Sequence, residues 1–477
     1  MFLGGKAMAR PAQMKFIELL VLTSDVCPVL DFLGKTGVVD LLDSSGASLA
    51  TTNKKAVVSQ AEAGEEASSS KNVELQRISD ELEHTQTTHK LSGWIAAKDV
   101  ASLAKDLEEL TKGAIAITSY DPEEVPEVKA GKYKIPVKFH HGKFIKSFDR
   151  MVLSYGVPEY SSIDPTHWVA FFFTLLFGLM FGDAGQGLVF VLLGILLTKN
   201  ALKFLSSWSK FGPVFIALGC SSTIMGILTG EFFANGHLLM PLSRFLTGLF
   251  GESHNHILHL MPSAGNINVI FGFFLFTLAI GFIINTTGLV LNFIDALRHK
   301  ELGRFLFGKI GFSGALFFWY VVWMAIRIVL LKIPPFWLDW VIIGVSLFGV
   351  FMGHPLSRLV TGKRPVFEHG LFTAVIEGVV EILEVISSYL SNTISFLRVG
   401  AFGLAHAVLG FIISTMSEMV GGIGGIAIMI IGNAIVIVLE GMIVAIQVIR
   451  LQYFEFFSKF FHKTGREFKP FCYEGNV

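Results

Sequence analysis

The sequence has 477 residues, of which 52% are hydrophobic and only 16% are charged. A soluble protein of this length needs more charge on its surface, so the composition predicts a membrane protein. Lysine plus arginine equal aspartate plus glutamate at 38 each, and no basic stripe with interleaved aromatics occurs, so we expect no nucleic-acid partner. The cysteines Cys27, Cys220 and Cys472 are too far apart in the sequence to indicate a metal site or a disulfide framework.

The first part of the chain, residues 1–164, holds most of the acidic residues and is predicted to form a small cytoplasmic α+β domain. Residues 44–70 are small and polar, which predicts a flexible linker. No P-loop, nucleophile elbow or metal triad occurs, so we expect no catalytic residue, cofactor or metal. The expected elements are strands at 16–22, 38–42, 91–96 and 114–120, and helices at 73–84 and 100–112.

The apolar runs lie in residues 165–465, which are predicted to form an α-helical, polytopic membrane domain followed by a cytoplasmic tail, 466–477. A helix needs about 20 apolar residues to cross roughly 30 Å of hydrocarbon. A glycine-rich turn separates the first two segments, and in it Asp183 is expected to be a turn residue rather than an ion ligand. The eight transmembrane helices are expected at 165–182, 185–205, 211–231, 267–294, 310–331, 337–353, 371–415 and 424–461.

The basic residues favour eight crossings with both termini in the cytoplasm. With the first domain inside, fourteen lysines and arginines fall in the inside loops and the tail, and only two fall outside. The first membrane segment is expected to be the targeting signal, because the N-terminal apolar run is short and interrupted. The inside residues are Lys199, Lys203, Lys210, Arg298, Lys300, Arg304, Lys309, Arg358, Lys363, Arg364, Lys459, Lys463, Arg466 and Lys469, and the outside ones are Arg244 and Lys332.

The last two segments are unusually long and carry polar and ionisable residues at helical spacing. Residues 371–415 would form a helix of about 67 Å, so this helix is expected to be tilted, kinked or extended beyond the bilayer. The spacing places the polar residues of each helix on one face. The two rows are Glu377, Glu381, Glu384, Ser388, Ser391, Ser395, Arg398 and His406 in the seventh segment, and Asn433, Glu440, Gln447 and Arg450 in the eighth.

Two interpretations of these rows are open. A charge inside hydrocarbon costs about 2.5–3.5 kcal/mol, so the acids and arginines could pair as structural salt bridges. Alternatively the rows form a hydrated path for protons or small cations, which the additional serines and the imidazole favour. Arg398 lies deep in its segment and cannot lose its proton, because the pKa of arginine is above about 12. A fixed cation there would repel protons and attract a carboxylate, as a gate does.

Residues 391–407, Ser-Asn-Thr-Ile-Ser-Phe-Leu-Arg-Val-Gly-Ala-Phe-Gly-Leu-Ala-His-Ala, resemble the signature of the membrane stator subunit of rotary V/A-type ATPases. That subunit is called a in eukaryotes and I in archaea and bacteria. Residues 177–185, 91–95, 438–442 and 456–461 are similar to further stretches of the same family. The resemblance covers the membrane half and the end of the soluble half.

The resemblance implies a subunit that hydrolyses no ATP itself and translocates H⁺ or Na⁺ through two aqueous half-channels. It implies that Arg398 and Arg450 face a rotating proteolipid c-ring, and that Glu384, Glu440 and His406 line the channels. Further implied partners are peripheral stalk subunits of the E and G type, a central-stalk socket subunit of the d or C type, and the lipid bilayer of the plasma membrane. Family members usually have about twice as much soluble chain, with a coiled coil beginning where residues 44–70 stand here.

Two functions other than that of a stator are compatible with a polytopic membrane protein. A rotor-independent channel or secondary transporter would show inverted repeats and broken helices near the midplane, and no convincing repeat relates the halves of the membrane region. A degenerate scaffold would retain the fold only, and the intact charged rows count against it.

Overall fold

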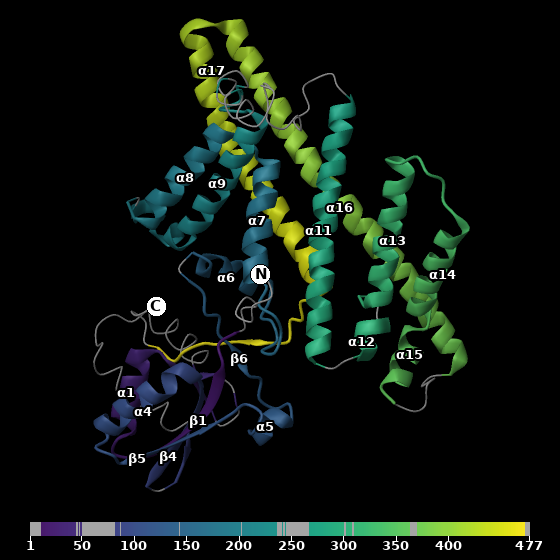
Figure 1. Cartoon of the computed structure of the whole chain (residues 1–477). Helices are drawn as coiled ribbons and strands as arrows, with labels where there is room; N and C mark the ends of the chain where they lie inside the picture. The colour runs from purple at the N-terminus through teal and green to yellow at the C-terminus, as the bar shows by residue number, and fades with distance from the viewer. Residues whose placement is uncertain are drawn as a thin grey trace. The chain divides into compact units, whose positions relative to one another are not determined.

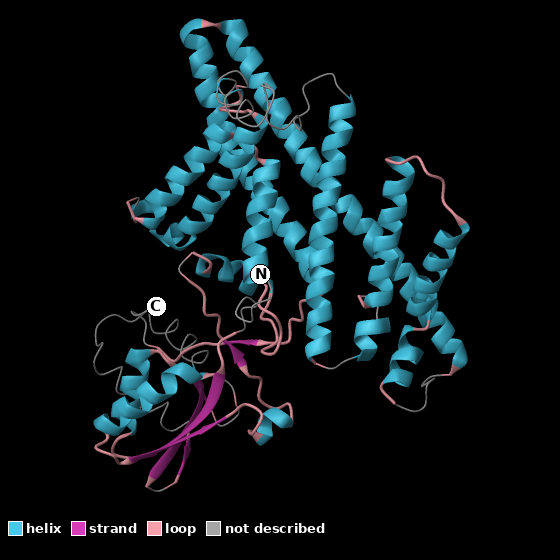
Figure 2. Ribbon diagram, viewed as in Figure 1, coloured by secondary structure: helices cyan, strands magenta, loops and turns pink. Residues whose placement is uncertain are grey.

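The computed structural model describes residues 11–43, 46, 48–49, 82–85, 87–142, 144–201, 203–235, 241, 244, 267–299, 302–307, 310–362 and 370–472. The chain divides into two compact units. Unit 1 comprises residues 1–142, 152–164 and 462–477, and unit 2 comprises residues 143–151 and 165–461. Within the described residues the strands belong to unit 1, whereas unit 2 is helical (Figure 1 and Figure 2).

Unit 1 is built on an antiparallel sheet in the order β2-β4-β1-β5, with β3 pairing with one end of β4. In the central strand β1, Ile17, Leu19 and Val21 alternate on one face of the sheet and belong to its main core, whereas Met14 and Phe16 are buried on the other face. The elements of unit 1 are β1 (Met14–Leu22), α1 (Val26–Thr36), β2 (Val39–Leu42), β3 (Glu83–His84), β4 (Thr88–Ala96), a 3₁₀ turn (Ala97–Asp99), α4 (Val100–Leu110), β5 (Ile115–Tyr120), α5 (Pro126–Lys129), β6 (Pro136–Val137) and β7 (Arg466–Glu467). A further helix, α6 (Lys146–Tyr155), contains residues of both units.

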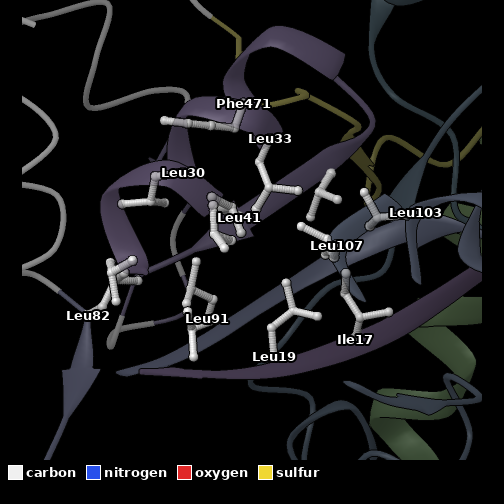
Figure 3. Close-up of a cluster of buried hydrophobic side chains, with 14 of the residues drawn as sticks. Ile17, Leu19, Leu30, Leu33, Leu41, Leu82, Leu91, Leu103, Leu107 and Phe471 are labelled. Atoms are coloured by element: carbon white, nitrogen blue, oxygen red, sulfur yellow. The ribbon is translucent and has the colours of Figure 1, made fainter. Parts of the chain in front are cut away.

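The two longer helices of unit 1 cover one face of the sheet and form its main core with it. Leu30 and Leu33 of α1 and Leu103 and Leu107 of α4 belong to one buried cluster with apolar residues of β1, β2 and β4. Figure 3 shows the ring of Phe471 beside Leu30 and Leu33, although Phe471 comes from the far end of the chain. The C-terminal segment is therefore part of the core of this unit.

Main-chain pairing holds the same C-terminal segment in place. β7 pairs in parallel with β6, and the Phe471 amide donates to the Val39 carbonyl at 2.8 Å. Phe468 packs on the second face of the sheet with Phe16 and Trp94. Residues 466–472 thus contact both faces of the sheet.

One ion pair joins the C-terminal segment to β2. Asp40 is fully buried, and its carboxylate accepts hydrogen bonds from Arg466 Nη2 at 2.8 Å and from Ser48 Oγ at 2.5 Å. Burial raises the pKa of Asp40 above its ordinary value, while Arg466 and the Ser48 hydroxyl oppose this rise. The pair matches the requirement that a buried charge has a partner.

Most elements expected in unit 1 are confirmed, with two differences. The helix α1 is not among the expected elements. Its Pro28 lies in the first turn, where proline is tolerated. The helix predicted at 73–84 is wrong at its end, because residues 83–84 form β3, and residues 73–81 lie outside the described residues. Of the predicted linker 44–70 only three residues are described, and among them Leu49 is buried in the main core.

Unit 2 contains long apolar helices, several of which pack with their backbones in close approach. A Cβ atom at Gly219 of α9 would lie 2.6 Å from the Gly187 carbonyl oxygen of α8, so only glycine permits this contact. Its elements are α7 (Thr166–Met180), α8 (Ala184–Thr198), a 3₁₀ segment (Lys203–Phe211), α9 (Gly212–Thr229), α11 (Ile267–Arg298), α12 (Leu302–Phe307), α13 (Phe312–Val329), α14 (Trp337–Phe351), α15 (Gly353–Val360), α16 (Leu371–Val420), α17 (Gly422–Ile435), α18 (Gly441–Leu451), and π-helical turns at Val436–Glu440 and Gln452–Phe456, ending in a 3₁₀ turn at Phe457–Lys459.

Five helical spans of the described chain are long and apolar enough to cross a membrane, or six if the pair α14 and α15, bent by 71°, is one span. The helices α7 and α8 are apolar but shorter. The chain is therefore a multi-pass membrane protein, and the number of eight crossings stays a prediction. The five spans are Trp208–Thr229, Val269–Arg298, Phe305–Val329, Leu371–Val420 and Gly422–Lys459.

Replacement of Arg466 by methionine should destabilise unit 1 by about 2–4 kcal/mol, because it leaves Asp40 buried without its cation. The folded-state pKa of Asp40 is already raised above its unfolded value, and loss of Arg466 raises it further. The ionised carboxylate then costs its full amount of stability above the folded pKa. This cost shrinks as the pH falls from the folded to the unfolded pKa, and it is absent below the unfolded pKa. The loss should therefore be largest at neutral pH and smaller in acid.

Hydrogen exchange of the β2 and β4 amides in the detergent-solubilised chain, corrected for intrinsic rates, measures this loss. Lys35→Met is the matched control, because Lys35 forms an exposed pair with Asp31 at 2.7 Å on α1. An exposed pair of this kind contributes only about 0.2–0.5 kcal/mol. Equal protection in the two variants would show that the Asp40 pair does not hold the C-terminal segment.

Candidate functional site

The polar row predicted in the seventh segment lies on α16, a single uninterrupted helix of 50 residues. At 1.5 Å per residue it is about 75 Å long. It packs against α17, α11, α14 and α7, and Figure 1 shows it as the longest ribbon of unit 2. The site is therefore built along one rigid rod, with the other helices supplying partners to it.

The first polar cluster surrounds Arg398. Arg398 Nη2 donates to Ser395 Oγ at 3.3 Å, and the Ser395 hydroxyl donates to Glu455 Oε1. Arg398 is half-buried, whereas Glu455 is only 5% exposed. The Glu455 carboxylate interacts electrostatically with both Arg398 and Arg450. One buried carboxylate thus interacts with two cations and offsets part of their charge, with a serine hydroxyl between the carboxylate and Arg398.

Glu455 is a candidate functional residue that the sequence analysis missed. It follows Arg450 by five residues, and five residues at 100° each would place it about 140° from Arg450 around an α-helix. The turn Gln452–Phe456 is π-helical, however, and each π turn includes one extra residue. The phase of the helix shifts there, and Glu455 reaches Ser395 on α16. The signal available in the sequence was a single acidic residue, five positions after Arg450.

The second cluster contains His406 and Glu440. His406 Nδ1 lies 2.9 Å from Glu440 Oε2, and the two residues are 3% and 7% exposed. The Phe181 ring packs against the imidazole, with ring centroids 4.9 Å apart. Glu231 and Asp183 are close enough to interact electrostatically with His406. A buried imidazole surrounded by carboxylates can accept and release protons.

A loop held by Asp183 supports the second cluster. Asp183 is fully buried, and its carboxylate accepts from the backbone amides of Gln186, Phe233 and Ala234 at 2.7–2.9 Å. Phe233 and Ala234 have φ of 49° and 62°, a left-handed conformation that is unfavourable for residues other than glycine. Asp183 thus caps α8 and fixes the loop that carries Glu231, which agrees with its expected role as a turn residue.

Asn433 ties this loop to the last helical span. Gln186 Nε2 donates to Asn433 Oδ1 at 2.8 Å. The Asn433 amide nitrogen in turn lies 3.4 Å from the Phe233 carbonyl oxygen and 2.8 Å from that of Met429. Asn433 of α17 therefore joins α8 and the loop that follows α9.

Lys459 forms a third buried polar contact, near the N-terminal part of α16. It is 4% exposed, although the sequence analysis counted it with the solvated basic residues of the inside loops. Its ammonium group lies 3.5 Å from Ser388 Oγ and 4.6 Å from the centroid of the Tyr389 ring. The aromatic face and the hydroxyl lower the cost of burying this cation.

The remaining predicted site residues, apart from Arg450 and its electrostatic interaction with Glu455, are not brought into these clusters. Glu381 lies 3.4 Å from His354, and Gln447 is half-buried. Between Glu440 and Arg450 the α-helical phase changes by about 80°, so Glu440 is buried while Arg450 is exposed. The residues that lie on the exposed surface of this chain are Glu377, Glu384, Ser391 and Arg450.

The sequence model of the V-type ATPase 116kDa subunit family matches residues 68–233 and 363–473, which is more than half of the chain. The chain belongs to this family. The second matched range contains Arg398, His406, Glu440 and Glu455. The family assignment thus agrees with the resemblance found in the sequence.

Three relatives in this family are similar to different extents. The chain is 44% identical over 228 residues to V-type ATP synthase subunit I 2 of Treponema pallidum, which covers 48% of this chain and 50% of the relative. It is 26% identical over 406 residues to A-type ATP synthase subunit I of Methanocaldococcus jannaschii, covering 81% and 55%. The corresponding protein of Saccharolobus solfataricus is 29% identical over 433 residues, covering 80% and 60%. The chain therefore spans about half the length of the curated relatives it matches.

Replacement of Asp183 by alanine should loosen the loop beside His406. It leaves three backbone amides without their acceptor, and each unsatisfied buried group costs about 1–3 kcal/mol. The amides of Gln186, Phe233 and Ala234 should then exchange about tenfold to hundredfold faster, which hydrogen-exchange mass spectrometry measures.

Asp25→Ala is the matched control, because Asp25 also precedes a helix but its side chain makes no capping hydrogen bond. It should leave the amides at the start of α1 nearly unchanged. Unchanged exchange at Phe233 and Ala234 in the Asp183 variant would contradict the role given to the carboxylate.

Proposed function

We propose that this chain is the ion-translocating stator subunit of a rotary V/A-type ATPase and is not itself catalytic. Two aqueous half-channels lead H⁺ or Na⁺ to and from a proteolipid ring, and Arg398 separates them. Each ring carboxylate would receive an ion from one half-channel, travel with the ring and release the ion into the other.

The observation that carries this proposal is the placement of polar clusters on both sides of Arg398 along α16. Lys459 and Ser388 lie on one side, and His406 and Glu440 lie on the other. Ser388 and His406 are eighteen residues apart, or about 27 Å, close to the roughly 30 Å thickness of the hydrocarbon core. Each cluster reaches only part of this depth, and the cation between them opposes direct passage of another cation.

The chemistry of Arg398 suits a gate that acts on a carboxylate. One of its nitrogens is used by Ser395, and Nη1 is buried with no hydrogen-bond partner in the part of the chain that the structure describes. A guanidinium offers a fork of donors that matches a carboxylate. A ring carboxylate arriving at Arg398 would therefore be held in its ionised form and would give up its ion.

The exposed face of the last two helical spans suits a rotor. Large apolar side chains on this face include Leu383, Leu390 and Ile394 of α16 and Ile446 near Arg450. The charged residues between them, including Glu384 and Arg450, would be costly against lipid alone. A proteolipid ring would supply both an apolar surface and the acids that Arg450 and Arg398 require.

The remaining partners and the orientation complete the proposal. Peripheral stalk subunits of the E and G type would hold unit 1, and a central-stalk subunit of the d or C type would link the ring to the ATPase head. Both termini would lie in the cytoplasm, with the membrane domain in the plasma membrane. The fourteen basic residues predicted on the inside support this orientation.

Arg398→Ala should abolish ATP-driven ion transport in membrane vesicles, reducing it to background, while the subunit stays assembled. Without the cation, ring carboxylates are no longer forced to ionise, and ions can leak between the half-channels. Vesicle acidification, or sodium uptake if the ion is Na⁺, measures the loss, and co-purification of the proteolipid measures assembly.

Arg358→Ala is the control, because Arg358 lies on α15, outside both clusters, and is half-buried as Arg398 is. It should transport normally. Normal pumping by the Arg398 variant would reject the gate. Transport by the chain purified without a proteolipid would instead favour a rotor-independent channel or transporter.

A further inference from the structure

Three cationic side chains from three elements of unit 2 gather where α8 ends and α9 begins. Arg150 of α6 lies over the Phe211 ring, with its guanidinium carbon 5.6 Å from the ring centroid. Lys210 directly precedes Phe211, and Lys199 stands at the C-cap position of α8. All three cations are exposed. We refer to Arg150, Lys199 and Lys210 as the basic patch.

A close backbone approach holds the ends of α8 and α9 together. A Cβ atom at Gly212, the first residue of α9, would lie 2.9 Å from the Thr198 amide nitrogen of α8, so only glycine permits this contact. Lys199 stands one position beyond the contact on α8, and Lys210 stands two positions before it. The contact therefore keeps the two lysines near each other, although like charges repel.

The protein itself supplies little negative charge to the basic patch. Among the described residues, none of its three cations forms an ion pair with a carboxylate. Residues 184–230 contain three lysines and no aspartate or glutamate. Asp149, the neighbour of Arg150 on α6, offsets at most one of the three charges. At least two positive charges thus remain for an anion from outside the chain.

The basic patch lies at one end of a candidate membrane span. The span that contains α9 begins at Trp208, two residues before Lys210. Trp208 is 55% exposed, and its ring lies beside that of Phe211 with centroids 5.9 Å apart. Exposed tryptophans and lysines at the ends of spans are typical of the lipid headgroup region. The anion nearest to the patch in that region is a lipid phosphate.

An exposed apolar stripe leads from the basic patch along α8. Leu188, Leu192 and Ile195 recur at spacings of four and three, and Lys199 follows after four more residues. These spacings place the four side chains on one face of the helix. The three apolar side chains are 50%, 59% and 38% exposed. A cation at the end of an apolar stripe matches a molecule with an anionic head and a long apolar tail.

The class of ligand follows from the patch and the stripe together. A soluble anion would satisfy the cations and leave the stripe unused. A zwitterionic phospholipid brings a cation of its own, which the basic patch would repel. An anionic phospholipid fits both features, and basic residues near the membrane surface favour such lipids.

We propose that the basic patch binds the headgroup of an anionic phospholipid whose acyl chains lie along the exposed face of α8. The bound phosphate would bridge α6 to the junction of α8 and α9. The inference rests on unit 2 alone and does not depend on the proposed function.

Photoreactive lipids test this site in the full chain. The chain is reconstituted in phosphatidylcholine vesicles with a trace of phosphatidylglycerol or phosphatidylcholine that carries a diazirine on one acyl chain. The vesicles are irradiated, and labelled peptides are mapped. Each cation near the surface favours an anionic lipid about fivefold, so with two net charges the phosphatidylglycerol probe should label α8 roughly tenfold to thirtyfold more.

Single substitutions separate the basic patch from the general charge of the protein. Lys199→Gln and Lys210→Gln should each lower the ratio of phosphatidylglycerol to phosphatidylcholine labelling about fivefold. Lys332→Gln is the matched control, because Lys332 is an exposed lysine in the loop between α13 and α14. It should leave the ratio unchanged.

A labelling ratio near one in the unmodified chain would overturn the proposal, as would an equal decrease of the ratio in Lys332→Gln. Displacement of the probe by soluble glycerol phosphate or by a polyglutamate peptide would also overturn it, because the patch would then bind free anions or acidic protein segments.

Should a variant fail to accumulate, the ratio in the unmodified chain still decides, together with its expected decrease at high salt, which screens exposed charges. Loss of ion transport with unchanged labelling would concern only the proposed function.

Discussion

The buried carboxylate of Glu455 is the interaction on which the arrangement of the last two helical spans depends. The Glu455 carboxylate interacts electrostatically with the guanidinium groups of Arg398 and Arg450, and it accepts a hydrogen bond from the Ser395 hydroxyl. Two unbalanced arginines in an apolar environment would repel each other and bear the full cost of lost hydration. With one carboxylate the three groups keep a net positive charge, so the cluster is stable and can still attract a further anion.

The contribution of the sequence to this site was uneven. Helical spacing placed Arg398, Ser395 and His406 in one row, and the structure shows these residues buried or half-buried on the regular helix α16. Their role in ion transport stays a prediction. Helical spacing failed beyond Arg450, where a π-helical turn changes the phase and brings in Glu455. It also treated Lys459 as solvated, since a lysine after an apolar run usually is. Periodicity assumes one helical pitch, and the two π turns break that assumption.

Unit 1 shows the complementary limit of sequence patterns. The four longer strands of the sheet were predictable from their short apolar runs, although β2 is buried at all four positions. The insertion of Phe471 into the core and the pairing of Arg466 with Asp40 were not, since these contacts join residues more than 400 positions apart. A tail of mixed polarity carries no local sign that its aromatic residues belong to a distant core. The one local signal was Asp40, a lone acid in an apolar strand, because a buried carboxylate needs a partner.

The cluster of His406 and Glu440 differs from the Arg398 cluster in the chemistry that it can perform. The Arg398 cluster is built on guanidinium groups, which keep their protons, so it can only attract or repel. The His406 cluster combines an imidazole with Glu440 and has Glu231 and Asp183 nearby, so its charge can change by proton exchange. The Asp183 carboxylate accepts hydrogen bonds from backbone amides, which hold its side chain in place. In the proposed function, the fixed cation of Arg398 would act as the barrier, and the His406 cluster on the same helix would exchange protons.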